Sequence, residues 1–231
     1  ADLLTPVSTY LTMRRTNVPS FLLESVEPDE KIGRFSFVGV APRMIVGSRG
    51  KVVRTFQENE EKTESGNLFE VIQRISSKFR QAPAANNVGF TGGFVGYIGY
   101  DCVRHIEHLH LHEAASSEED DAQLGLFDTV VRFDHRNQLV TIICNVVVDE
   151  VLPLEQQYET AKKKLETVEL RLKNSTVVTS NFSCNISKML NRNDNEEYRR
   201  SVLRAKQYIV EGDIIQAELS RKLQAEFSGD P

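Results

Sequence analysis

Residues 20–25 read Ser-Phe-Leu-Leu-Glu-Ser, a short apolar run that ends on a carboxylate and a hydroxyl. Three consecutive large apolar residues are typical of a strand that is buried on both faces. The Glu24 carboxylate can accept a hydrogen bond from an ammonium group, and the Ser25 hydroxyl can both donate and accept. A small zwitterion with an apolar side chain, such as an amino acid, would find both kinds of partner here. The alternative interpretation is a strand that runs into a turn, with Ser25 in an ST-turn and Glu24 in solvent.

The composition around this stretch is typical of a globular protein with a sizeable core. The chain has 231 residues, of which 40% are hydrophobic and 26% are charged. Its net charge of −5 argues against nucleic-acid binding, because it implies no basic face. No apolar run approaches the roughly 18–20 residues that cross a bilayer, and no signal peptide opens the chain. We therefore expect no membrane partner and no nucleic-acid partner.

Cysteine usage indicates the compartment. Cys102, Cys144 and Cys184 are widely spaced, and none belongs to a Cys-x-x-Cys pair. This pattern fits a reducing compartment and argues against a disulfide framework or a zinc knuckle. We expect a cytoplasmic protein, with an organelle left open because the chain starts without Met.

Helices and strands alternate along the chain in a way that predicts an α+β fold, with largely antiparallel sheets layered with helices. Apolar residues recur at helical spacing in three segments, which are 68–79 after a cap at Asn67, a long segment that opens at Pro153, and 195–210. Period-two alternation predicts strands in five segments, which are 33–40, 43–47, 51–56 and the two arms of a hairpin at 126–149. The second arm is expected to be central in its sheet.

Two segments near the N-terminal end are harder to assign. Residues 3–11 read as an edge strand, because Pro6 removes one donor from a ladder. Residues 58–66 are polar and acidic, so we expect an exposed loop there.

The glycines of residues 90–100 do not form a phosphate-binding motif. They match neither G-x-G-x-x-G nor G-x-x-x-x-G-K-[ST]. They instead predict a strand whose backbone approaches a neighbouring strand closely.

Four histidines lie in one segment, at His105, His108, His110 and His112. If 108–112 is extended, three imidazoles share one face at period two and could hold a transition metal. Leucines fill the alternate positions, however, and an acidic loop follows, as in an ordinary edge strand. We predict no metal site in this chain.

Short blocks along nearly the whole chain carry a resemblance to one enzyme family. In order, they are Thr5–Ser8, Phe21–Ser25, Gly33–Gly39, Gly92–Tyr97, Leu126–Asp128, Glu211–Gln216 and Leu219–Arg221. Together they resemble anthranilate synthase component I, one of the chorismate-utilising enzymes. Members of this family are about twice the length of this chain, so the resemblance implies an N-terminal piece that is inactive alone.

The resemblance implies a lyase of tryptophan biosynthesis that converts chorismate and ammonia to anthranilate and pyruvate. It implies feedback inhibition by tryptophan, with Leu23, Glu24 and Ser25 lining the inhibitor pocket and Arg34 as a weaker candidate for its polar wall. A glutamine amidotransferase partner would supply the ammonia. Mg²⁺ would be held by glutamates beyond residue 231.

The resemblance also gives a role to Gln216. Residues 213–223 alternate as a strand, with Ile214, Gln216, Glu218 and Ser220 on one face and Ile215, Ala217 and Leu219 on a core face. Chorismate-utilising enzymes that add water carry Lys at the position of Gln216, whereas those that add ammonia carry Gln. Ammonia is already nucleophilic and needs only placement, which a neutral amide can provide. The alternative is a strand glutamine that bonds to neighbouring backbone.

One position departs from the family pattern. Glu218 stands where relatives carry Val or Asn. It leaves open whether the pocket wall is more acidic in this chain or the strand is locally shifted.

We expect three parts in the chain. Residues 1–173 would form the regulatory domain, the Ser/Thr/Asn-rich residues 174–193 a linker, and residues 194–231 the start of the chorismate-binding domain. Two other functions stay open at this point. One is the related aminodeoxychorismate synthase component I, and the other is a non-catalytic regulatory module that binds an amino acid.

Overall fold

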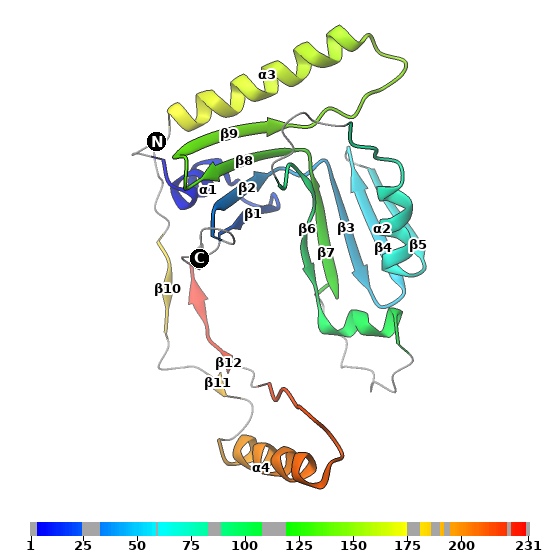
Figure 1. The fold of residues 1–231 in the computed structure, drawn as a ribbon, viewed down its shortest axis with the longest axis vertical. Helices are drawn as coiled ribbons and strands as arrows, with labels where there is room; N and C mark the ends of the chain where they lie inside the picture. Colours follow the sequence, from blue (N-terminus) through cyan, green and yellow to red (C-terminus); the bar gives the residue numbers. More distant parts are fainter. Residues whose placement is uncertain are drawn as a thin grey trace. The chain divides into compact units, whose positions relative to one another are not determined.

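The computed structural model describes residues 4–24, 33–58, 60–82, 89–107, 119–174, 181–185, 190–191, 195–220 and 223–229. Helices are combined with sheets whose strand pairs are antiparallel, which confirms the predicted α+β class (Figure 1). The chain separates into two compact units, Ala1–Val177 and Val178–Pro231. Among the described residues, no helix combines the length and the apolar character that crossing a membrane requires.

A four-stranded sheet contains the strand that opened the sequence analysis. Its order is β1 (Ser20–Leu23), β2 (Phe35–Val40), β8 (Thr129–Asp134) and β9 (Leu139–Cys144). Helices α1 (Pro6–Met13) and α3 (Leu154–Lys173) pack against this sheet. The buried side chains of this core come from both helices and from the two middle strands, and they are Met13, Val38, Val131, Phe133, Val168 and Leu172.

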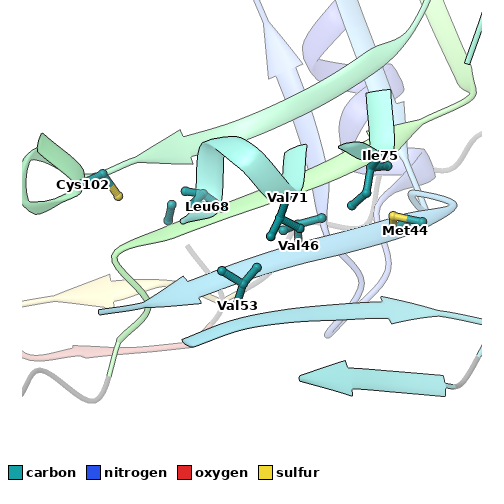
Figure 2. Close-up of a cluster of buried hydrophobic side chains, with 8 residues drawn as sticks. Met44, Val46, Val53, Leu68, Val71, Ile75 and Cys102 are labelled. Atoms are coloured by element: carbon teal, nitrogen blue, oxygen red, sulfur yellow. The ribbon is translucent and has the colours of Figure 1, made fainter. Parts of the chain in front are cut away.

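A five-stranded sheet forms the rest of the first unit. Its order is β5 (Glu60–Ser65), β4 (Val52–Gln57), β3 (Met44–Arg49), β7 (Ala122–Phe127) and β6 (Gly93–Ile98). Helix α2 (Leu68–Ser76) presses Leu68, Val71 and Ile75 onto Val46 and Val53 of this sheet (Figure 2). Asn67 caps the helix as predicted, because its side chain accepts a hydrogen bond from the Phe69 N–H at 2.9 Å. A 3₁₀-helix (Tyr100–His105) follows β6.

The described residues of the second unit form one helix and short strand pairs. Helix α4 spans Asn195–Glu211, β10 (Ser183–Cys184) pairs with β13 (Phe227–Ser228), and β11 (Leu190–Asn191) pairs with β12 (Leu223–Gln224). No residue of α4 is buried.

The prediction of an edge strand over residues 3–11 is wrong, because Pro6–Met13 is helix α1. Thr5 and Ser8 form a capping box in which the Thr5 side chain accepts from the Ser8 N–H at 3.0 Å. Pro6 occupies the first helical position, where its missing N–H has no partner to lose. The same proline that suggests an edge strand is therefore equally suited to begin a helix.

Two further expectations about strands are wrong. Residues 60–65 form strand β5 rather than a loop, and they pair with β4 along their whole length. Their charged side chains are typical of an exposed edge strand. Strand β9 lies at an edge of its sheet, and β8 is the strand buried in the middle. Alternation describes the two faces of a strand, but it does not reveal how many neighbours the strand has.

The close approach predicted for the glycines of 90–100 is confirmed at Gly96. A methyl group at this position would overlap the backbone oxygen of Gln123 on the paired strand β7. Only glycine therefore fits the spacing between β6 and β7 at this point.

Candidate functional site

The end of strand β1 holds two of the predicted ligand-binding residues. Leu23 lies opposite Phe37 of β2 and is 46% exposed, and Glu24 is exposed as well. Ser25 lies outside the described residues. The expectation of a strand buried on both faces is wrong, because Leu23 is exposed and the other residues of β1 are only partly buried. Strand β1 lies at the edge of its sheet, next to β2. The described part of this site is therefore an accessible strand end that offers an apolar side chain and a carboxylate.

Behind this strand end lies a group of four rings that we call the phenylalanine cluster, made of Phe21, Phe37, Phe90 and Phe127. Phe21 of β1 meets Phe127 of β7 edge-on, with ring centroids 4.7 Å apart and planes at 87°. Phe37 of β2 meets Phe90 in the same way, at 5.3 Å and 85°. Edge-to-face contacts of this kind are favourable beyond the apolar area they bury. The cluster thus joins the four-stranded sheet to the five-stranded sheet.

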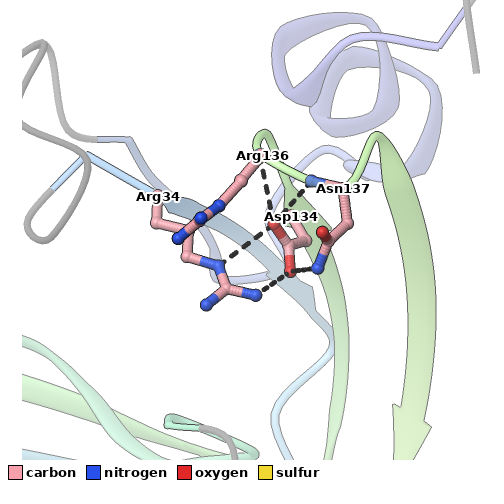
Figure 3. Close-up of polar contacts among 4 residues, drawn as sticks. All are labelled: Arg34, Asp134, Arg136 and Asn137. Carbon is pink, nitrogen blue, oxygen red and sulfur yellow. Dashed lines mark hydrogen bonds and ion pairs between the residues drawn. The ribbon is translucent and has the colours of Figure 1, made fainter.

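The predicted polar residue Arg34 is engaged by Asp134, the last residue of β8 (Figure 3). The guanidinium Nε and Nη2 donate to Asp134 Oδ1 and Oδ2 at 3.2 and 2.7 Å. The hydrogen bond from Arg34 holds the pKa of the Asp134 carboxyl well below its ordinary range, against the opposing effect of burial. The same contact raises the pKa of Arg34.

Asp134 also closes the hairpin between β8 and β9. It accepts the backbone N–H groups of Arg136 and Asn137 at 3.1 Å each and the Asn137 side-chain amide at 2.9 Å. A ligand carboxylate at Arg34 would have to compete with this network. Sequence reasoning missed Asp134, which lies 100 positions from Arg34 along the chain.

Gln216, the predicted catalytic residue, lies in the second unit. The expected strand over 213–223 is wrong for residues 213–220, which form no strand. Gln216 is exposed, and Ile215, which was expected in a core, is 97% exposed. A strand needs a neighbour to satisfy its backbone groups, and the described residues provide none for this segment. Leu23 and Gln216 belong to different compact units of the chain.

A cavity of about 310 Å³ lies between α3 and the segment that follows β9. Its charged lining includes Lys164 and Asp128, whose Nζ and Oδ1 are 2.7 Å apart. Asn145, also in the lining, donates its side-chain amide to the backbone oxygen of Thr91 at 2.7 Å. Neither Leu23 nor Glu24 lines this cavity. Through these contacts, its polar groups connect α3 and the loop before β6 to the junction of the two sheets.

The described residues offer no place for a metal ion. They contain no group of three or more His, Cys, Asp or Glu side chains arranged to hold one. His105 packs its ring edge-on against Phe69, with centroids 6.3 Å apart, and the other three histidines of the segment lie outside the described residues. The described residues therefore do not fit a Mg²⁺ site, and no chemical step is assigned through one.

The environment of Cys102 does not favour nucleophilic chemistry. Cys102 is buried, and burial raises the pKa of its thiol. A raised pKa lowers the fraction of thiolate, which is the reactive form.

The sequence of the chain is similar to those of known proteins. The family model described as chorismate binding enzyme matches residues 19–231. The chain is 34% identical to an anthranilate synthase alpha subunit 1 of Arabidopsis thaliana, a chloroplastic protein, and 33% identical to anthranilate synthase component 1 of Acetivibrio thermocellus. Both matches cover 100% of this chain, but 43% and 48% of the two relatives.

A solved structure shows the same fold. The crystal structure of anthranilate synthase component I from Streptococcus pneumoniae TIGR4 matches with a TM-score of 0.58 and 16% identity, over 100% of this chain and 49% of that one. The chain therefore spans about half the length of the relatives it matches. Since the family model covers most of the sequence, the chain belongs to the family of chorismate binding enzymes.

Proposed function

We propose that this chain contributes to component I of an anthranilate synthase, a lyase that makes anthranilate for tryptophan biosynthesis. The observation that carries the proposal is similarity along the entire chain to anthranilate synthases from a plant and a bacterium, at 34% and 33% identity. The substrate would be chorismate, and a glutamine amidotransferase partner would supply ammonia. The cytoplasmic location stays a prediction, since the Arabidopsis relative is described as chloroplastic.

The reaction balances as chorismate plus ammonia giving anthranilate, pyruvate and water. A carbon–nitrogen bond forms on the ring, the ring hydroxyl leaves as water, and the enolpyruvyl group leaves as pyruvate. In this proposal Gln216 orients ammonia, because its amide oxygen can accept an N–H and leave the lone pair free. A lysine in this place would suit water instead, since water must lose a proton to attack.

The test is an assay of the intact protein with chorismate and ammonium ions, with anthranilate followed by fluorescence and pyruvate by a coupled enzyme. Equal amounts of both products are expected. An aminodeoxychorismate synthase would form an aminated product without releasing pyruvate, so amination without pyruvate would contradict the proposal.

Gln216→Lys tests the residue assignment. We expect the rate of anthranilate formation to fall by about 10²-fold, the lower end of what a positioned group contributes. Gln207→Lys is the matched control, because Gln207 is an exposed glutamine of α4 that bonds to Glu211 at 2.7 Å. Equal rates in the two variants would remove the role assigned to Gln216.

We also propose that tryptophan inhibits the intact protein by binding at Leu23, Glu24 and Ser25, with Arg34 at the polar wall. The support is the exposed apolar side chain and carboxylate at the end of β1. Calorimetry should show weaker tryptophan binding in Glu24→Gln, which loses the charge that attracts the ammonium group, and in Ser25→Phe. The control is Glu60→Gln at the distant edge of the other sheet. Unchanged affinity in the two site variants would refute this assignment.

A further inference from the structure

The ring of Phe21 lies directly over the backbone of Gly39. The two residues are opposite each other in the ladder between β1 and β2. A methyl group built at Gly39 would overlap three carbons of the Phe21 ring. The absence of a side chain at Gly39 is therefore what allows the Phe21 ring to lie across β2 and reach the other sheet.

From this position Phe21 contacts two further members of the phenylalanine cluster. Its ring centroid is 4.7 Å from that of Phe127, the last residue of β7, and 6.3 Å from that of Phe90. The loop that carries Phe90 is fixed in turn by the Asn145 amide, which donates to the Thr91 oxygen at 2.7 Å. Phe21 thus connects an edge strand to the junction between the two sheets.

Strand β1 is short and lies at the edge of its sheet. It has four residues and pairs with one neighbour, β2. Leu22 packs on the core beneath α1 and α3, on the opposite face from Phe21, because successive side chains of a strand alternate. Leu23 follows Phe21 by two positions, so it lies on the same face as Phe21, at the exposed end of the strand, and Glu24 follows it.

We propose that Phe21, seated on Gly39, is the positioning residue for the amino-acid site at the end of β1. It sets the place of Leu23 and Glu24 relative to the junction of the two sheets. This inference rests on the proposed tryptophan site, but it concerns residues outside that site.

The test uses the intact protein and three variants, Phe21→Leu, Gly39→Ala and the double variant. Each single change displaces or removes the ring, so we expect tryptophan affinity to fall about tenfold in each, as the loss of an aromatic contact network implies. In the double variant the smaller leucine leaves room for the new methyl group. We therefore expect the double variant to bind tryptophan as the Phe21→Leu variant does, because the ring that the methyl group would displace is already absent.

Two further measurements separate positioning from a general loss of structure. The kcat and KM for chorismate without tryptophan should stay unchanged in all three variants. Hydrogen exchange at the amides of residues 21–24 should accelerate in each single variant, and it should accelerate no further in the double variant than in Phe21→Leu. Leu139→Ala, on the opposite edge strand β9, is the control. It should change neither the affinity for tryptophan nor the hydrogen exchange at residues 21–24.

The outcomes are distinguishable. If the wild type binds tryptophan and both single variants bind it equally well, the positioning role of Phe21 is overturned. It is also overturned if the losses in affinity add up in the double variant. If the wild type does not bind tryptophan, the inhibitor proposal fails, and hydrogen exchange decides the positioning role. Unchanged protection of residues 21–24 in Phe21→Leu would then reject it.

Discussion

Helices α2 and α4 both carry apolar side chains at helical spacing, but they differ completely in burial. Helix α2, with 9 residues, buries Leu68, Val71 and Ile75 against the five-stranded sheet (Figure 2). Helix α4, with 17 residues, buries none, and its Leu203 is 66% exposed. A periodic pattern therefore specifies which face of a helix is apolar, whereas burial requires a partner surface. Among the described residues that surface is present for α2 and not for α4.

The difference extends to the two units. The described residues of the first unit form two cores, one beneath each sheet. In the second unit, no side chain of residues 181–185, 195–220 and 225–229 is buried. Because burial of apolar area is the main favourable term in folding, stability should be concentrated in the first unit. Four substitutions test this comparison, from the largest expected effect to the smallest.

Leu68→Ala should have the largest effect on stability. Leu68 is fully buried in the core beneath α2, so its loss removes apolar contacts and leaves a cavity. We expect the free energy of unfolding of the 231-residue chain to fall by about 2–5 kcal/mol in a urea titration. Leu203→Ala in α4 makes the same chemical change at an exposed site and should alter the free energy of unfolding by less than about 0.5 kcal/mol. Similar losses in the two variants would contradict the contrast between the units.

Gly96→Ala should come second. The added methyl group meets backbone atoms of Gln123 and Leu124, which cannot rotate away as a side chain can. We expect a loss of about 1–3 kcal/mol in the same titration. Gly66→Ala is the matched control, because a methyl group there has nothing within 4 Å. If the two variants unfold alike, the close approach of β6 and β7 does not limit this position.

Much of the fold could be predicted because local signals are strong in the first unit. The Asn67 cap, the apolar spacing of 68–79 and the hairpin at 126–149 each depend on neighbouring residues. The prediction fails where one signal has two meanings. Pro6 fits both an edge strand and the first turn of a helix, and charged residues 60–65 fit both a loop and an exposed edge strand.

The candidate site was harder to predict, because its contacts join distant parts of the chain. Arg34 is paired with a residue 100 positions away, and the phenylalanine cluster joins four segments. The spacing of apolar residues along the sequence gives no information on which distant residues will be in contact. The motif around Leu23 and Glu24 could be located from the sequence, but its position on an edge strand depends on strand order, which alternation does not contain.

Asp134→Asn should have the third largest effect on stability, and this effect should depend on pH. The hydrogen bond from Arg34 holds the pKa of Asp134 below the ordinary value of about 3.9, so the unfolded chain takes up a proton first as the pH falls. The stabilisation from this carboxylate is therefore fully present above pH ~5 and is lost as the pH falls through the region below 4. The wild type should be more stable than the variant by a constant amount from pH 7 to 5, and the difference should shrink at pH 3.

Arg34→Lys sharpens this result. Lysine keeps the positive charge but cannot reproduce the two-point contact of the guanidinium, so the variant should show the same pH trend with a smaller loss of stability. A difference between wild type and Asp134→Asn that is equally large at pH 3 and pH 7 would mean that the carboxylate charge is not what stabilises the hairpin.

Gln216→Ala should have the smallest effect on stability and, under the proposed function, a large effect on activity. The side chain is exposed in an unpaired segment, so its removal should change the free energy of unfolding of the 231-residue chain by less than about 0.5 kcal/mol. The same change in the intact protein should slow the use of ammonia by about 10²-fold. A large loss of activity with little loss of stability is typical of a residue that acts in the reaction and not in packing. Loss of stability as large as that in Leu68→Ala would instead favour the interpretation of Gln216 as a structural strand residue, and the second unit would then have a core of its own.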